Sequence, residues 1–484
     1  MIKVVVHFIA IFVALTPLDI IAAQQQVCDL LASDELNSAG IAGTRVSYLS
    51  KPYFGCSDGT EIRADSSITY EATGLTRLIG DVYFSEGTQE LHSDEALYYS
   101  SLGRLNATGR IEVEDRSKGS FVTGDHLSLL QENQERPEEL MTINGTPAYA
   151  TMSVSTVVDG GEISPSTAAS PSDSRSTEFQ INAKVLHFIG DRMLQALGSV
   201  KVERDSLELY SDSLELFQDG SITKLFFNAV IEGSLTSSGA STNVKGDSIY
   251  ILFSDDTLKQ IQSIGTSEAI YDNGSVYGSA VTMFFENDEL ETISSTGNSE
   301  LNDDQKEAEP QALAITRGFT IMGDSIELSL REGRLLSAVG IGTAKGISQT
   351  QPDTRTMTEF SFLNEDWIEG DTVSIEFSQT PSDRISKSST ETGDEVNIET
   401  MTARGRARSF FRRSSNEVIG DSIDPAGMEL SYVRGDEVRI FFSDGEIRQM
   451  EVDNAQGSFL QPILRPDTIS SDSTGLDKRH REHQ

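Results

Sequence analysis

The stretch Gly246-Asp247-Ser248-Ile249-Tyr250-Ile251 sets the pattern of the whole chain, because it recurs. An Asp stands before alternating apolar and polar residues, which is the period of a half-buried β-strand. The other copies begin at Asp65, Asp94, Asp125, Ala183, Asp212, Ser279, Asp324, Asp371 and Asp436. The copies at Ala183 and Ser279 keep the apolar pattern without the Asp. The sequence therefore contains ten units.

Each unit continues with a turn and a second apolar stretch, as at Gly333-Arg334-Leu335 and then Val339. The period is 29 to 35 residues where no insertion intervenes, and no segment sustains helical i, i+3, i+4, i+7 spacing. We expect an all-β, extended and solenoid-like chain of stacked short strands. A Gly precedes the Asp in the clearest copies, and we expect it to adopt a positive φ at a sharp turn.

The composition along the chain divides it into segments. Three stretches rich in Ser, Thr, Pro or acidic residues interrupt the rhythm, and we interpret them as surface insertions. We expect a signal peptide at 1–23, an N-terminal segment with a disulfide at 24–60, repeats at 61–152, 179–298 and 312–462, insertions at 153–178, 299–311 and 379–396, and a disordered tail at 463–484.

The first residues have the layout of a cleaved secretory signal, with Lys3, an apolar run from Val4 to Leu15 and a small-residue end before Gln24. The alternative is a membrane anchor that stays attached. The chain has two cysteines, Cys28 and Cys56, and an even pair in an exported chain indicates one disulfide. Two cysteines at this spacing do not supply a zinc-ligand set.

Acidic side chains outnumber basic ones by 76 to 38, which gives a formal net charge of −38. Such a field repels nucleic acid and anionic membrane surfaces. The charge has a plain explanation in solubility or in a salty medium. Otherwise, any bound polyanion must be held by apolar contact or through divalent cations.

No residue constellation suggests catalysis. Of the histidines, only His92, His126 and His187 lie in the body of the chain, and none has the spacing of a triad or a metal site. We expect no enzyme, no metal and no cofactor. Two acidic doublets, Asp255-Asp256 and Asp303-Asp304, lack the spaced ligands of a calcium loop.

One basic cluster is unusual in so acidic a chain. It is either an outward strand face paired with neighbouring carboxylates or a patch for a lipid phosphate or a partner. Its members are Arg404, Arg406, Arg408, Arg412 and Arg413.

In each unit, the second and fourth residues after the Asp position share one face of the strand, and some units add Phe at the sixth position. These positions form one apolar stripe, which is either the closed core of a repeat protein or the lining of a groove for acyl chains. The groove candidates are Leu127, Leu129, Leu214, Leu216, Ile249, Ile251, Phe253, Val281, Met283, Ile326, Leu328, Val373, Ile375, Val438 and Ile440.

The units at Asn243-Val244-Lys245-Gly246-Asp247-Ser248-Ile249, at Leu91-His92-Ser93-Asp94-Glu95-Ala96-Leu97-Tyr98 and at Thr402-Ala403-Arg404-Gly405-Arg406-Ala407-Arg408-Ser409-Phe410-Phe411 resemble the OstA-like repeat of lipopolysaccharide-transport proteins, the LptA type and the periplasmic part of LptD. The resemblance covers about residues 60 to 462.

The resemblance implies a β-jellyroll open along one side, the β-taco. It also implies a periplasmic bridge that shields the acyl chains of lipid A, joins proteins of the same fold edge to edge, and forms a homo-oligomer by the same contact. The acidic charge, rather than the resemblance, predicts no nucleic-acid partner. The competing hypothesis is a structural or adhesive exported β-solenoid with a closed core.

Overall fold

The computed structural model describes residues 28–57, 59–133, 136–154, 177–204, 206–217, 221–235, 241–254, 257–272, 274–287, 289–297, 311–316, 318–348, 365–378, 397–414, 418–419, 422–423, 428–443 and 446–460. These residues form strands and turns and contain no helix, which confirms the all-β prediction. The predicted signal peptide, the insertion at 379–396, the tail, and most of the insertions at 153–178 and 299–311 lie outside the described residues.

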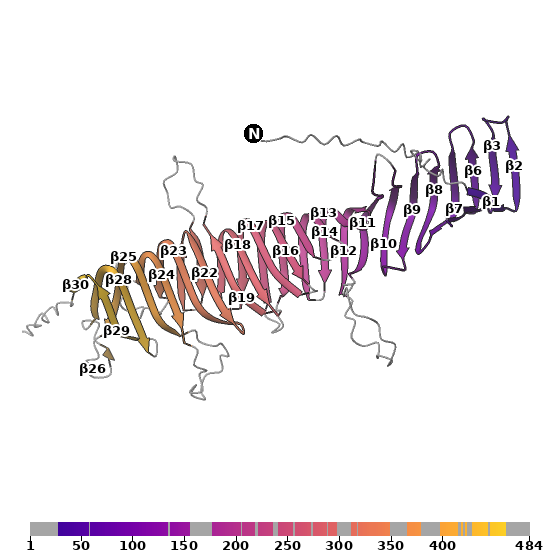
Figure 1. The fold of residues 1–484 in the computed structure, drawn as a ribbon. Helices are drawn as coiled ribbons and strands as arrows, with labels where there is room; N and C mark the ends of the chain where they lie inside the picture. The colour runs from indigo at the N-terminus through magenta and orange to yellow at the C-terminus, as the bar shows by residue number, and fades with distance from the viewer. Residues whose placement is uncertain are drawn as a thin grey trace, which may run out of the picture. The chain divides into compact units, whose positions relative to one another are not determined.

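The chain divides into two compact units, each of which contains several of the ten sequence repeats. Figure 1 labels their strands. Unit 1 comprises Met1–Val202 with Glu215–Asp219, and unit 2 comprises Glu203–Leu214 with Gly220–Gln484. The strands that begin in unit 1 are β1 (Cys28–Ala32), β2 (Glu35–Ala39), β3 (Val46–Ser50), β4 (Tyr53–Cys56), β5 (Glu61–Arg63), β6 (Ser66–Tyr70), β7 (Leu75–Glu86), β8 (Gln89–Tyr99), β9 (Arg104–Asp115), β10 (Ser120–Leu130), β11 (Leu140–Val154), β12 (Thr177–Ile189) and β13 (Met193–Arg204).

The strands that begin in unit 2 are β14 (Leu207–Phe217), β15 (Ile222–Ser234), β16 (Ser241–Ser254), β17 (Thr257–Tyr271), β18 (Gly274–Glu286), β19 (Glu289–Thr296), β20 (Ala312–Thr316), β21 (Phe319–Gly323), β22 (Ser325–Arg331), β23 (Arg334–Ser348), β24 (Asp366–Phe377), β25 (Ile398–Ser414), β26 (Val418–Ile419), β27 (Ser422–Ile423), β28 (Met428–Ser443), β29 (Glu446–Asp453) and β30 (Gln456–Leu460).

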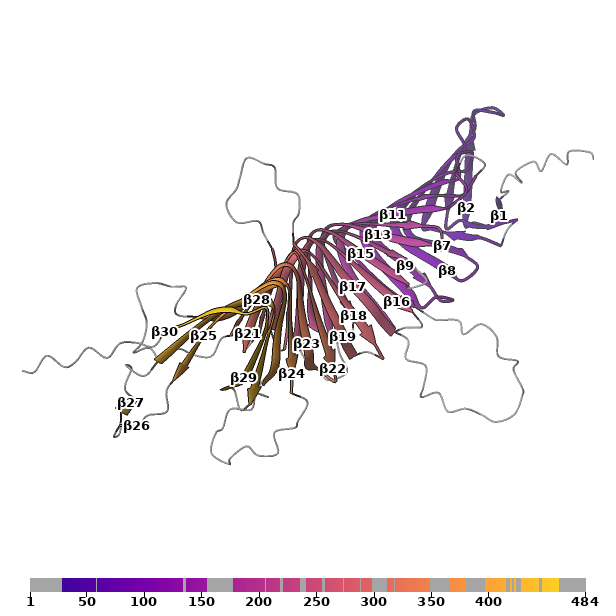
Figure 2. The ribbon, with the colours of Figure 1, turned by 60° about the vertical axis from the view of Figure 1, so that its left-hand side comes forward.

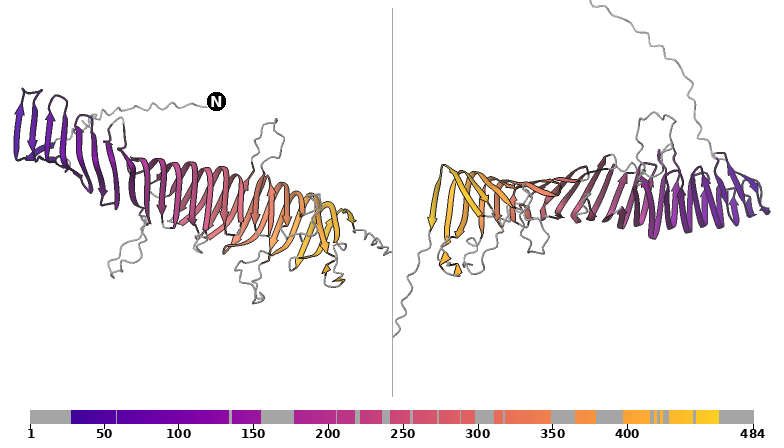
Figure 3. Two further views of the ribbon diagram at one scale, coloured as in Figure 1. Left: turned by 180° about the vertical axis from the view of Figure 1, so that it is seen from behind. Right: turned by 90° about the horizontal axis from the view of Figure 1, so that it is seen from below.

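Most of these strands are bent in the middle, so that the sheet they form is folded along the bends (Figure 2). For example, β16 pairs with β17 from Asn243 to Lys245 and again from Ser248 to Ser254, and the register shifts in between. We call arm A the strand halves that follow an Asp position together with the halves of neighbouring strands that pair with them. Arm B comprises the halves that precede an Asp position and the halves that pair with those. Figure 2 shows the strands of unit 2 folding over along a common line, and Figure 3 shows the same strands from behind and from below.

Antiparallel pairing runs through each arm separately. In arm A of unit 2, β18 continues through β19 and β22 to β23, and in arm B it continues through β20 and β21 to β23. The predicted insertion at 299–311 thus interrupts a strand near its bend and leaves both ladders intact. The two arms are therefore joined to each other at the bends, while each keeps a hydrogen-bonded ladder of its own.

At every bend, the residue at the Asp position contacts a residue on the next strand. The partner is most often a Gly with positive φ, because a Cβ at that place would overlap the Asp carboxylate, as at Gly265, Gly342 and Gly405. The contacts are Asp65–Gly80, Asp94–Gly109, Asp125–Thr146, Lys184–Gly198, Asp212–Asn228, Asp247–Gly265, Ser279–Gly297, Asp324–Gly342, Asp371–Gly405 and Asp436–Asn454. We call this series the bend ladder.

Where Asn replaces the partner Gly, it keeps the positive φ and donates a hydrogen bond. The Asn228 amide donates to the Asp212 carboxylate at 2.9 Å, and Asn228 has a φ of 51°. Asn is one of the few residues with a side chain that tolerates this conformation. The partner is therefore left-handed at eight of these ten contacts, and the exceptions are Thr146 and Gly297.

Two expectations about the repeat are corrected by this geometry. The Gly that precedes the Asp, such as Gly246 or Gly323, does not have a positive φ; it is needed because a Cβ would meet the neighbouring strand, at 2.9 Å from the Ile341 carbonyl oxygen in the case of Gly323. The fourth copy is counted from Lys184 and not from Ala183, because Ala183 faces the interior with 2% of its surface exposed.

We predict that Gly342→Ala lowers the midpoint of thermal unfolding more than Gly333→Ala does. The two glycines have similar φ values of 75° and 73°, so both variants carry a backbone strain of about 1 kcal/mol. Only at Gly342 does the new Cβ overlap Asp324, since nothing lies within 4 Å of a Cβ at Gly333. The overlap costs about 2 kcal/mol more.

Adding Asp324→Ala to the Gly342→Ala variant should recover most of the difference. Equal destabilisation by the two glycine substitutions, measured by circular dichroism during heating, would contradict a packing role for the bend ladder.

Candidate functional site

The space between the two arms is a wedge of apolar side chains. In β17, the residues beside the bend are Ser263 and Ser267, whose hydroxyls are hydrogen-bonded at 3.0 Å. One step further out come Ile261 and Ala269, which are buried. Small residues fit where the arms converge, and larger ones fill the widening space.

The predicted groove residues all lie on the inner face of arm A. Of those fifteen, only Leu129 and Phe253 are half-buried. The others have at most 4% of their surface exposed, and several have none. Within each compact unit, the structure thus gathers them on the arm A wall, and their contact with a lipid stays a prediction.

The inner face of arm B was missed by the sequence interpretation. It is built from the third residue before each Asp position, and all of these residues are buried with at most 5% of their surface exposed. The signal was present, because this position is apolar in every unit. Its members are Ile62, Leu91, Val122, Ile181, Leu209, Val244, Val276, Ile321, Ile368 and Val433.

We call the edge of the wedge away from the bends the mouth, and side chains from both arms meet across it. In unit 2, the ring of Phe319 on arm B lies 5.0 Å from that of Phe377 on arm A. The ring of Phe411 on arm B likewise lies 6.4 Å from that of Phe442 on arm A. Phe377 and Phe442 occupy the sixth position of their repeats, which the sequence assigned to the apolar stripe.

In places the arms are in close contact. A Cβ at Gly346 on arm B would lie 3.2 Å from Met401 Cε and 3.3 Å from Val373 Cγ1, both on arm A. A Cβ at Gly340 on arm A would lie 3.3 Å from Ile321 Cγ1 on arm B. The side chains of unit 2 therefore fill this part of the wedge themselves.

The predicted basic cluster is largely neutralised by adjacent strands. Four of its members form ion pairs, at 3.2 Å for Arg404–Glu437 and 2.9 Å for Arg412–Asp366. Pairing with Arg404 lowers the pKa of Glu437. The remaining pairs are Arg406–Asp371 and Arg408–Glu369. The side chain of Arg413 lies outside the described residues, as do the two acidic doublets.

The histidines of the body have ordinary structural contacts. The His92 ring lies 5.1 Å from that of Tyr83, and His187 Nδ1 is 2.9 Å from the Thr142 hydroxyl. Burial lowers the pKa of His187. Among the described residues, no three His, Cys, Asp or Glu side chains gather as metal ligands, and no helix is long and apolar enough to cross a membrane.

Near the N-terminus, Cys28 and Cys56 form a disulfide. It joins β1 to β4, which are paired in antiparallel register at these two residues. The covalent link therefore holds the first strands of arm B in unit 1.

No family model and no curated protein matches this chain. Among solved structures, it is similar to LptH, the LptA homologous periplasmic component of the conserved lipopolysaccharide transport device from Pseudomonas aeruginosa. The identity is 14%, the TM-score is 0.24, and the match covers 29% of this chain and 94% of that one.

At the mouth of unit 1, charged residues replace the aromatic pairs. Lys118 on a turn of arm B forms an ion pair with Asp191 on a turn of arm A. Glu139 lies beside them, and burial together with the charges of Glu86 and Asp191 raises its pKa. Its neighbour Glu138 is paired with Arg192 at 3.2 Å, which lowers the pKa of Glu138.

We predict that Glu139→Gln stabilises the protein at neutral pH. Because the pKa of Glu139 is raised in the folded state, the folded protein holds this proton more tightly than the unfolded chain does. The free energy of unfolding therefore falls as the pH rises from the ordinary glutamate pKa through the raised one, and Gln avoids this loss. The gain should therefore vanish in acid below the ordinary glutamate pKa. Thermal unfolding measured from pH 4 to 8 tests this, with Glu138→Gln as the control that shows no gain at neutral pH.

Proposed function

We propose that the wedge shields lipid acyl chains and that the protein carries lipopolysaccharide through the periplasm. The observation that carries the proposal is the pair of apolar inner faces, one on each arm, that continue from unit to unit of the repeat. The resemblance of the repeat to that of lipopolysaccharide-transport proteins supports the choice of lipid and compartment. The predicted secretory signal is consistent with export.

The energetics favour entry of a chain at the mouth. Leaving an acyl chain of a dozen methylenes in water costs about 10 kcal/mol, at about 0.8 kcal/mol for each. Parting an aromatic pair such as Phe319–Phe377 loses about 1 kcal/mol beyond the area uncovered, and an incoming chain covers that area again. Among the described residues, no backbone hydrogen bond crosses the mouth. The arms can thus separate there while the bend ladder holds.

Edge strands supply a route to partners of the same fold. Of the described strands, β29 and β30 each pair only with β28, one in arm A and the other in arm B. Both therefore present unpaired backbone groups on one side, where a strand of a second protein can add. We propose that the chain joins another copy or a related transport protein in this way.

The competing function is that of a structural or adhesive solenoid. The close approach of Met401 to Gly346 and the full burial of Val373 and Ile375 favour it, because they describe a packed core. The two functions differ in whether a lipid ever contacts the inner faces.

A photo-crosslinking residue at Ile251 distinguishes the two functions. Ile251 faces the wedge, and its neighbour Tyr250 on the same strand points the other way. We expect the probe at Ile251 to label lipopolysaccharide in cells that express the protein, and the probe at Tyr250 to label it much less. Equal labelling at both positions, or labelling of protein alone, would rule out a lipid-lined wedge.

Closing the mouth should block the function. We predict that Cys at Phe319 and Phe377, joined by a short reversible bis-thiosulfonate reagent, reduces lipid bound per protein by at least fivefold, with recovery after reduction. The control places the same two cysteines at Thr320 and Glu376, whose side chains lie off the inner faces. Undiminished lipid binding by the crosslinked protein, measured by mass spectrometry, would contradict entry at this mouth.

A further inference from the structure

On the outside of arm B in unit 2, a row of charged side chains crosses four neighbouring strands. The register places Lys345 on β23 opposite Glu369 on β24, Glu369 opposite Arg408 on β25, and Arg408 opposite Arg434 on β28. The next residues along these strands, such as Gly346 and Val433, lie on the inner face. We call the four residues the outer row.

Two cations of the outer row have no carboxylate partner among the described residues. Arg408 is paired with Glu369, but the Arg434 guanidinium donates only to the neutral side-chain oxygen of Gln456. Lys345 Nζ lies 5.3 Å from the centre of the Trp367 ring. Like charges directly opposite each other on neighbouring strands are destabilising, and Glu369 compensates only Arg408, so an anion bound at Arg434 would relieve the repulsion.

A second row, of aromatic residues, runs beside the outer row on the same face. Trp367 on β24, Phe410 on β25 and Tyr432 on β28 lie opposite one another. Each is two residues away from the outer-row residue on its own strand, so its side chain points to the same face. The Trp367 and Phe410 rings are stacked with centres 6.3 Å apart, and Tyr432 meets Trp367 edge-on at 6.4 Å. Trp367 and Tyr432 are only half-buried, so part of each ring is exposed beside the outer row.

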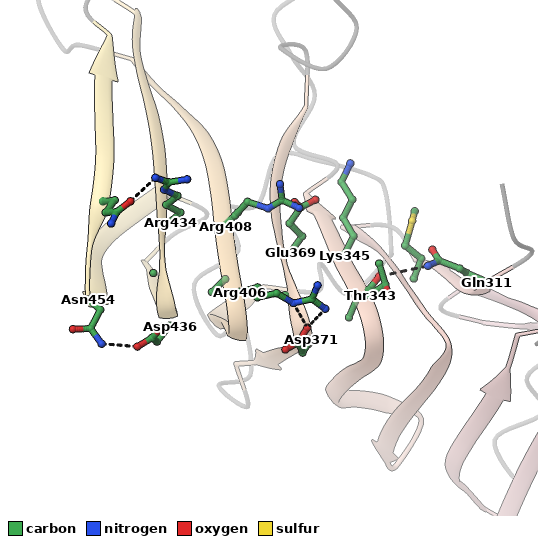
Figure 4. Close-up of a pocket in the computed structure, with 16 residues that line it drawn as sticks. Gln311, Thr343, Lys345, Glu369, Asp371, Arg406, Arg408, Arg434, Asp436 and Asn454 are labelled. Atoms are coloured by element: carbon green, nitrogen blue, oxygen red, sulfur yellow. Dashed lines mark hydrogen bonds and ion pairs between the residues drawn. The ribbon is translucent and has the colours of Figure 1, made fainter. Parts of the chain in front are cut away.

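The outer row lines a surface depression of about 660 Å³ (Figure 4). Its other wall is the bend ladder, where Arg406 is held by Asp371 at 2.9 Å and Asn454 is bound to Asp436. A volume of this size is ordinary for a small-ligand site. The walls are fixed by backbone pairing and by the bends, so the spacing of the backbone positions that carry the cations is set before a ligand arrives.

We propose that this depression binds a phosphorylated oligosaccharide. Lys345 and Arg434 lie three strands apart, about 14 Å at the usual strand spacing, and Arg408 lies between them. Guanidinium groups bind phosphate in a fork geometry, and aromatic faces pack against the apolar faces of sugar rings. A long nucleic acid is disfavoured by the net charge of −38, but a sugar with one or two phosphates meets only the local charges, which are Lys345, Arg406, Arg408 and Arg434 against Glu369, Asp371 and Asp436.

The site stands independently of the proposed function, because it lies outside the wedge. The same chemistry is offered by a free glycan and by the sugar head of a glycolipid whose acyl chains lie elsewhere. The test therefore uses both forms of the ligand.

The test is calorimetric titration of the full mature chain. The probes are the phosphorylated oligosaccharide from deacylated lipopolysaccharide, the same material after dephosphorylation, and inorganic phosphate. The variants are the double variant Lys345→Gln/Arg434→Gln and the single variant Trp367→Leu. If Trp367→Leu does not fold, Trp367→Phe takes its place. The control is Lys245→Gln, which removes a lysine that is paired with Glu268 elsewhere on unit 2.

We expect the phosphorylated probe to bind at least tenfold more tightly than the dephosphorylated one, and the double variant to lose about tenfold in affinity. Trp367→Leu should weaken the oligosaccharide and leave inorganic phosphate unchanged. Arg434→Gln should not lower the thermal midpoint, because it removes a like-charge pair. The Lys245→Gln control should bind as the wild type does.

Equal affinity of the double variant and the wild type would overturn the proposal, and so would tighter binding of an acidic peptide of the same charge. Intact lipopolysaccharide that binds more tightly than its deacylated form, with the gain lost when the mouth is crosslinked, supports the carried lipid as the source. No such gain supports a free glycan. A failure of wedge labelling at Ile251 leaves binding of the deacylated probe unaffected, so the two proposals fail separately.

Discussion

The contact between the residue at the Asp position and its partner on the next strand, most often an Asp against a left-handed residue, is the constraint on which the rest of the structure depends. It places the bend at the same level in each strand, as at Asp247–Gly265 and Asp324–Gly342. Without a common level, the two halves of a strand would not align with those of its neighbours. The bend ladder therefore turns one bent strand into two arms, each with its own pairing.

The shape of the wedge is a consequence of this alignment. Because the arms converge at the bend, the first inner residues must be small, as with Ala403 and Ala407 on β25, which are fully buried. Farther out, the separation grows and side chains such as Met401 and Phe411 fill it. Backbone hydrogen bonds act along each arm, whereas only side chains act across the mouth. The fold is thus rigid in one direction and separable in the other, which is the property that a carrier of acyl chains requires.

The sequence allowed the strand class and the register of the Asp position to be predicted, because both depend on short-range periodicity. It also placed Ile249 and Ile251 on one wall. The second wall was missed, since the residues before the Gly-Asp pair precede a bend that reverses the side-chain alternation. A pattern counted forward from Asp247 does not extend backward to Val244 across that bend.

The cations of the outer row show a second limit of sequence interpretation. Arg406 and Arg408 attract attention because they are close together in the chain, yet each has a carboxylate on the neighbouring strand. Lys345 and Arg434 are far apart in sequence and each looks unremarkable, and only the pairing of β23, β24, β25 and β28 brings them to one face.

The distribution of charge connects the two proposed sites. An excess of carboxylates keeps the outer surface soluble and repels polyanions at long range, so a phosphorylated ligand must be recognised at short range by a few cations that lack carboxylate partners. The wedge has the opposite character, since it is apolar in every unit and offers no specificity along its length. A lipid with a phosphorylated sugar head has both kinds of surface. An apolar track that repeats and a charged site on β23, β24, β25 and β28 would together let such a molecule move freely and still be held at a defined place.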